Sequence, residues 1–110
     1  MADTVANRIA AIPRAVFRVT DAGRGFTVSQ GHALMGELGL VAPGGDILTV
    51  NGGNGNLVEV SPSGRQVAVR ALDVSGSPPG AGALFGLAVK PHHRAVYFVD
   101  DATNTFALLH

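Results

Sequence analysis

Two overlapping internal repeats constrain this chain more than any other feature of its sequence. Residues 39–60 align with residues 86–109, and the offset between matched positions grows from 47 to 49 along the alignment. Residues 16–28 align with residues 57–69 at a constant offset of 41. A period of roughly 40 to 50 residues is typical of propellers and solenoids. The repeats therefore predict a fold built from similar units that pack in series.

The complete unit of the repeat has the pattern of four short β-strands. Its apolar runs are rich in Ile, Val and Leu and end at turn-forming residues. The Ser-Pro-Ser-Gly sequence at 61–64 is typical of a type I turn, because Pro presets the backbone angle and Gly tolerates the exit. We expect strands at 38–42, 46–51, 56–60 and 65–72. Together they predict a four-stranded antiparallel meander over 38–72.

Partial units flank this meander. We expect a hairpin at 14–29 before it and three further strands at 85–109 after it, separated from it by a linker rich in Gly, Pro and Ser. Residues 1–12 form either a short helix, capped by Asp3, or a partly ordered N-terminal arm. The predicted organisation is thus an arm at 1–12 and one partial repeat domain at 13–110.

The composition excludes several classes of protein. The 110 residues suffice for one domain, and the eight basic residues balance the eight acidic ones, so nucleic acid is not an expected partner. The absence of cysteine excludes disulfides and thiolate chemistry. No apolar run reaches the length of a membrane span, and the first residues lack the pattern of a signal peptide. As written, the sequence favours a cytoplasmic protein without a membrane partner.

The repeat resembles the NHL-repeat branch of the β-propellers. The stretch GLVAPGGDILTVN at 39–51 is similar to the first two strands of such a blade, and FVDDATNTF at 98–106 is similar to the closing part of longer bacterial proteins of this kind. The resemblance implies an all-β fold of four-stranded propeller blades, with about two blades in this chain. Such proteins are usually six-bladed and often exported, which leaves the localisation of this chain unknown.

A chain with about two blades cannot cover its own sheet faces and edges. Each blade of a repeat protein buries its faces against its neighbours, so about three or more repeats are normally needed for stability. We therefore expect a homo-oligomer, with a trimer that forms six blades as the favoured assembly. Residues 24–29 of one copy would then complete the last sheet of another. The alternative is that the chain is a fragment whose missing blades lie upstream.

Polar residues gather after two of the expected strands. We consider Asn51, Asp100 and Asp101 as candidate ligands of Ca²⁺ or another divalent cation, because hard cations prefer carboxylate and amide oxygens. In propeller enzymes of the gluconolactonase-like type, such oxygens hold a cation at the channel mouth. Asn51 and Asn54 each precede Gly, however, and Asn-Gly steps are common formers of tight turns. Turn formation is the favoured interpretation, and no cofactor is required.

Histidines supply the remaining candidates for a binding site. His92 and His93 are adjacent in an expected turn, and imidazole is a common metal ligand or general base, although an exposed turn explains the pair without chemistry. No serine has the surroundings of a hydrolase nucleophile, so no catalytic residue is assigned. The sequence favours a non-catalytic, self-associating scaffold that binds through its loops. The alternative is a fragment of a metal-dependent lactonase or esterase.

Overall fold

The computed structural model describes residues 1–12, 25–92 and 95–110, and these residues form an all-β fold. They contain three antiparallel sheets and no α-helix, which confirms the prediction of an all-β chain. The only helical element among them is a single 3₁₀ turn at Pro43–Gly45. Within these ranges, no helix has the length and apolar character needed to cross a membrane.

The central sheet contains four strands that pair in chain order. Its strands are β4 (Glu37–Val41), β5 (Ile47–Asn51), β6 (Asn56–Val60) and β7 (Gln66–Ala71). Aliphatic residues dominate β5 and β6, and short turns connect the strands, as the repeat pattern predicts. The turn between β6 and β7 uses Gly64 at a φ of 90° and a hydrogen bond from its N–H to Ser61 O of 2.9 Å. The central sheet is therefore a four-stranded meander.

The C-terminal sheet contains three strands that also pair in chain order. They are β8 (Leu84–Val89), β9 (Val96–Asp100) and β10 (Thr105–Leu109). The segment before β8 is a series of turns, in agreement with its content of Gly and Pro. Because β10 pairs only with β9, its other edge has no strand partner among the described residues.

The N-terminal sheet contains strands from two distant parts of the chain. Its strands are β1 (Ala2–Asp3), β2 (Arg8–Ala11) and β3 (Phe26–Gln30). Residues 1–12 thus form a hairpin instead of the short helix considered above, because β2 gains backbone partners from β3. The expected hairpin at 14–29 falls partly on residues 13–24, which lie outside the described residues. Its final strand, β3, pairs with β2 of the same chain.

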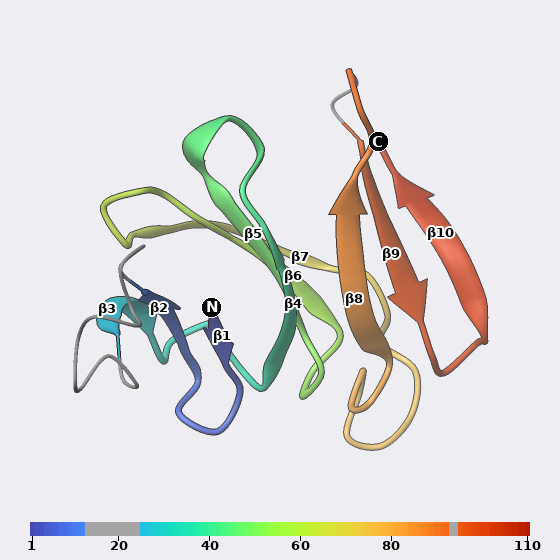
Figure 1. Cartoon of the computed structure of the whole chain (residues 1–110). Helices are drawn as coiled ribbons and strands as arrows, with labels where there is room; N and C mark the ends of the chain where they lie inside the picture. The colour runs from blue at the N-terminus through green and yellow to red at the C-terminus, as the bar shows by residue number, and fades with distance from the viewer. Residues whose placement is uncertain (13–24, 93–94) are drawn as a thin grey trace.

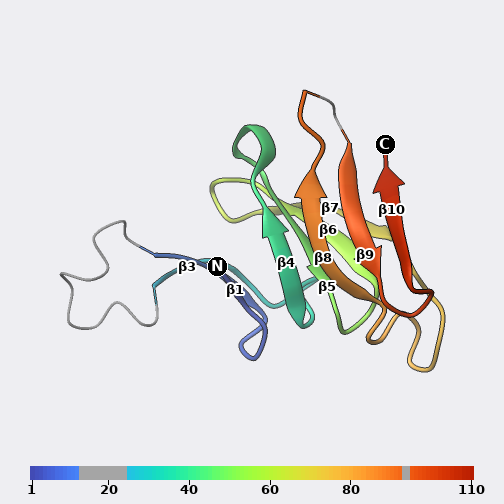
Figure 2. The same ribbon diagram turned by 45° about the vertical axis from the view of Figure 1, so that its right-hand side comes forward.

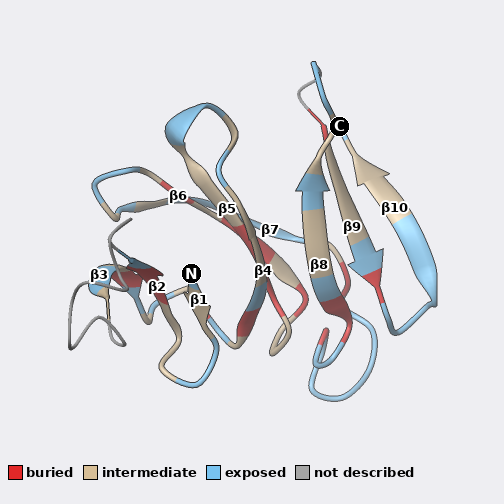
Figure 3. Cartoon of the chain, viewed as in Figure 1, coloured by how far each residue is buried: buried red, intermediate tan, exposed pale blue. Residues whose placement is uncertain are grey.

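The three sheets pack in series, with the central sheet between the other two (Figure 1). One core, which includes Ile9, Leu34 and Val58, joins the N-terminal sheet to the central sheet. A second core, which includes Val50 and Leu84, joins the central sheet to the C-terminal sheet. Figure 3 shows that buried residues concentrate in these contacts, whereas β7 and part of β10 are exposed. Both faces of the central sheet are therefore covered over β5 and β6, whereas β7 stays exposed.

The sheets contact one another chiefly through the first strand of each. The strand β1 contacts β4, and β4 contacts β8, although far more of the chain separates these strands than separates neighbours within a sheet. Figure 2 shows β4 and β8 side by side, with the later strands of each sheet spreading away from them. Gly39 allows this approach, because a Cβ at this position would lie 2.8 Å from Leu87 Cδ2. The sequence predicted about two repeat units, whereas the described residues form one four-stranded sheet and two three-stranded sheets.

Candidate functional site

Asn51 and Asn54 shape the turn between β5 and β6. Asn51 is fully buried, and its Nδ2 donates hydrogen bonds to Ala33 O at 2.7 Å and to Asn54 Oδ1 at 3.0 Å. Asn54 Oδ1 also accepts a hydrogen bond from the N–H of Asn56 at 3.3 Å. These contacts fold the turn back on itself and attach it to the loop before β4. The two amides therefore act on the backbone in this structure, as turn-forming residues do.

Glu37 lies directly across the sheet from Asn51 and was not singled out by the sequence patterns. The two residues are cross-strand partners of β4 and β5, so their side chains share the face toward the N-terminal sheet. Both are fully buried. Both carboxylate oxygens of Glu37 and the Oδ1 of Asn51 lack a hydrogen-bond partner among the described residues. Three buried acceptor oxygens thus lie on this face without a hydrogen bond among the described residues.

Burial raises the pKa of the Glu37 carboxyl group above its ordinary value of 4.5. The negative charge of Asp3 also raises this pKa. The peptide N–H groups of Glu37 and Arg8 lower it, although neither has the geometry of a hydrogen bond to the carboxylate. The available signal in the sequence is a single acidic residue within the mostly apolar run 33–42. A charge at such a position is unusual, because carboxylates are rarely buried without a partner.

Asp100 and Asp101 follow β9 and have different environments. Asp100 is 8% exposed, and its Oδ1 accepts a hydrogen bond from the N–H of Thr103 at 3.2 Å. Asp101 is exposed, and its N–H donates to Ala83 O at 2.6 Å. Asp100 therefore shapes the turn from β9 to β10, and Asp101 attaches that turn to the residue before β8.

Asp73 is a second acidic residue near Asp100 that the sequence patterns did not identify. It follows β7, is 8% exposed, and accepts a hydrogen bond from the N–H of Ser75 at 2.5 Å. Hydrogen bonds from the side chain and the N–H of Ser75 lower the pKa of Asp73, while burial opposes this effect and the Asp100 carboxyl group is a further hydrogen-bond neighbour. The two carboxyl groups thus lie close together where the loop after the central sheet meets the C-terminal sheet.

The candidate cation ligands do not form one site in the described part of the chain. Asn51 faces the N-terminal sheet, whereas the adjacent Val50 belongs to the core shared with the C-terminal sheet, where Asp100 lies. No group of three or more His, Cys, Asp or Glu side chains in these residues has an arrangement that could hold a metal ion. Calcium usually takes six to eight oxygen ligands. The geometry at Asn51, Asp100 and Asp101 thus does not match a shared cation site.

His92 lies in the connection between β8 and β9, at the opposite end of β9 from Asp100. It is exposed and has a φ of 61°, a left-handed backbone conformation that is uncommon outside glycine and asparagine. The left-handed turn places His92 at the surface, away from both asparagines. His93 lies outside the described residues.

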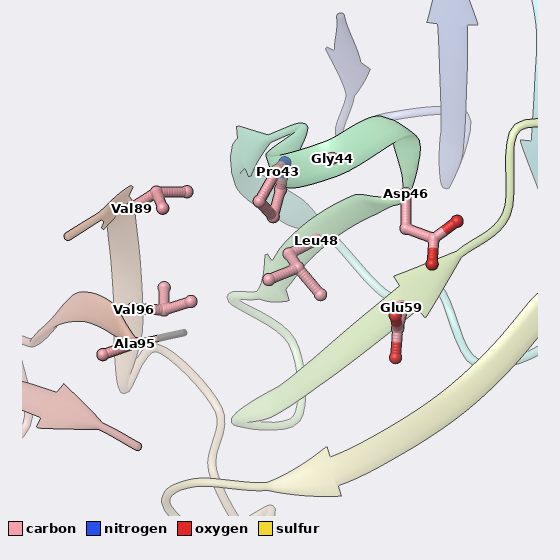
Figure 4. Close-up of a pocket in the computed structure, with 8 residues that line it drawn as sticks. All are labelled: Pro43, Gly44, Asp46, Leu48, Glu59, Val89, Ala95 and Val96. Carbon is pink, nitrogen blue, oxygen red and sulfur yellow. The ribbon is translucent and has the colours of Figure 1, made fainter. Parts of the chain in front are cut away.

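A groove of about 660 Å³ opens between the central and C-terminal sheets (Figure 4). Leu48, Val89 and Val96 provide apolar surface, and the carboxylates of Asp46 and Glu59 lie on its other side. This combination suits a ligand with an apolar body and a positively charged group, because opposite charges attract most strongly beside apolar surface. The sequence patterns missed the groove, since its walls come from two different sheets.

Comparisons with protein-family models, with curated proteins and with solved structures find no match for this chain.

Proposed function

We propose that this chain is a non-catalytic, self-associating module of the β-propeller type. The supporting observation is that its three antiparallel sheets pack face to face in series and approach one another through their first strands. This is how propeller blades are arranged around an axis. A series of three sheets has two end sheets, and each needs cover for its outer face.

The exposed side chains support association over enzymatic activity. Phe85, Val99 and Phe106, all on the C-terminal sheet, are among the exposed large apolar residues. Val99 and Phe106 are cross-strand partners, and exposed apolar side chains that lie together are typical of interaction sites in soluble proteins. By contrast, the metal-dependent hydrolase alternative gains no support, because no contact joins Asn51 to Asp100 or Asp101 in the described residues.

The proposal is tested by the mass of the purified protein in solution. We expect native mass spectrometry and light scattering at micromolar concentration to give a multiple of the 11.2 kDa chain mass. The melting temperature should increase with protein concentration, because association stabilises the folded state by mass action. A monomer with a cooperative and concentration-independent melt would contradict the proposal.

A further inference from the structure

Three apolar side chains of the central sheet pack against the C-terminal sheet. Leu48, Val50 and Leu57 belong to the core between these two sheets. Val50 on β5 and Leu57 on β6 are cross-strand partners, so they lie on the same face. This face of the central sheet is thus a packing surface for the next sheet in the series.

The same positions of the repeat form an open surface on the C-terminal sheet. An offset of 49 residues leads from Leu48, Val50 and Leu57 to Tyr97, Val99 and Phe106. Val99 and Phe106 are again cross-strand partners, and the rings of Tyr97 and Phe106 stack with their centroids 5.0 Å apart. Val99 is 40% exposed and Phe106 is 69% exposed. We call Tyr97, Val99 and Phe106 the open face.

The opposite faces of the two sheets are also equivalent. Leu40 and Val60 of the central sheet pack toward the N-terminal sheet, and offsets of 47 and 49 residues lead from them to Leu87 and Leu109. Leu87 and Leu109 pack toward the central sheet. Both pairs of neighbouring sheets therefore use the same face of the repeat in the same order. If the same packing order continues, another sheet of the series packs on the open face.

We propose that the open face binds the N-terminal sheet of a second copy of this chain. This inference rests on the self-association proposed above and names its contact surfaces. The N-terminal sheet lies at the other end of the series. Its exposed Thr27 is the cross-strand partner of Ala10, the residue next to Ile9, so Thr27 lies on the face opposite to the core of Ile9. Repetition of one packing relation creates a head-to-tail contact. Two chains with three sheets each supply the six sheets of a closed ring. The proposed assembly is therefore a dimer, and not the trimer that the sequence led us to expect.

The first test changes the charge of the open face. We expect Phe106→Glu to raise the dissociation constant of the dimer at least about tenfold, because buried aromatic residues contribute strongly to interfaces and an unpaired carboxylate would have to be buried. Val69→Glu is the matched control. Val69 lies on β7, is 52% exposed and is not part of the open face, so its substitution should leave the dissociation constant unchanged.

The second test distinguishes a head-to-tail contact from a symmetric contact. The chain contains no cysteine, so Thr27→Cys on the outer face of the N-terminal sheet and Phe106→Cys on the open face each introduce a single thiol. We expect a short bismaleimide to cross-link a mixture of the two variants and to leave each variant alone without cross-linked dimers. Cross-linking of Phe106→Cys with itself would show that two open faces meet, which would overturn the head-to-tail arrangement.

The outcomes separate this inference from the more general proposal. A dimer that is disrupted by Phe106→Glu and cross-linked only in the mixture supports both. An oligomer whose stability does not respond to Phe106→Glu, or one with a number of chains other than two, leaves self-association intact and overturns the assigned surface or stoichiometry. A monomer at all accessible concentrations overturns both.

Discussion

Gln66 on β7 and Ser29 on β3 join the central sheet to the N-terminal sheet. Gln66 Nε2 donates hydrogen bonds to Ser29 Oγ at 3.1 Å and to Gly31 O at 3.0 Å. Its Oε1 accepts a hydrogen bond from the N–H of Ala33 at 2.9 Å. One amide thus satisfies three groups of a segment that precedes it by more than thirty residues.

We expect Gln66→Ala to lower the free energy of unfolding by about 1–3 kcal/mol, because it removes three hydrogen bonds and leaves Ser29, which is 7% exposed, without this partner. Urea denaturation followed by circular dichroism measures the change. Gln30→Ala is the control, since Gln30 is exposed and makes one bond of 3.3 Å to Ala6 O. The prediction is wrong if both variants change the stability equally.

Gly64 lies where the turn after β6 contacts the strand β3, so a substitution at Gly64 tests this contact. Its φ is 90°, and a Cβ at this position would collide with Val28 O. We expect Gly64→Ala to destabilise the fold by about 1–3 kcal/mol more than Gly44→Ala, because β3 would have to move away. Gly44 is a matched control, with a φ of 63° and no atom within 4 Å of the added Cβ. Chemical denaturation of both variants measures the difference, and equal losses would contradict the contact.

Glu37 makes stability depend on pH in a defined direction. Because burial raises its pKa, the folded chain binds more protons at this group than the unfolded chain above pH 4.5. The contribution of Glu37 to stability is therefore greatest below this pH and falls as the pH rises through the folded pKa. We expect Glu37→Gln to be more stable than the parent protein at pH 8, with the difference vanishing toward pH 4.

Thermal melts of Glu37→Gln across this pH range provide the measurement. Glu59→Gln is the control, because Glu59 is only partly buried at the surface of β6. A Glu37→Gln variant that loses stability at every pH would indicate that the ionised carboxylate has a partner.

Asp3 makes stability depend on pH in the direction opposite to Glu37. The hydrogen bond from Arg8 Nε to Asp3 Oδ2, at 3.0 Å, is the main cause of the lowered pKa of Asp3. This bond stabilises the hairpin of β1 and β2 above pH 3.8, and its contribution is lost as the pH falls through the lower pKa of the folded chain. Asp3→Asn should weaken the hairpin at pH 7 and reduce its loss of stability in acid. Hydrogen exchange of the Ala6 and Ala10 N–H groups measures this, and an unchanged acid response would contradict it.

The candidate site was predictable only where local chemistry determines it. The Asn-Gly steps predicted the turn after β5, and the hydrogen bonds of Asn51 and Asn54 lie in that turn. The roles of Glu37 and Asp73 depend on segments from other sheets, so no pattern near them revealed these roles. The groove beside Asp46 has the same origin, because its opposite wall belongs to the C-terminal sheet.

The sequence by itself determined that this chain is built from short extended segments joined by tight turns. Alternating aliphatic residues and the Ser-Pro-Ser-Gly turn favour β-structure through local backbone and side-chain preferences, which need no distant partner. Only the tertiary structure decided that β2 pairs with β3, that Glu37 is buried, and that the face with Phe106 is open while the equivalent face with Leu57 is covered. These properties depend on which sheets meet, and the free energy of burial belongs to that contact and not to either segment alone.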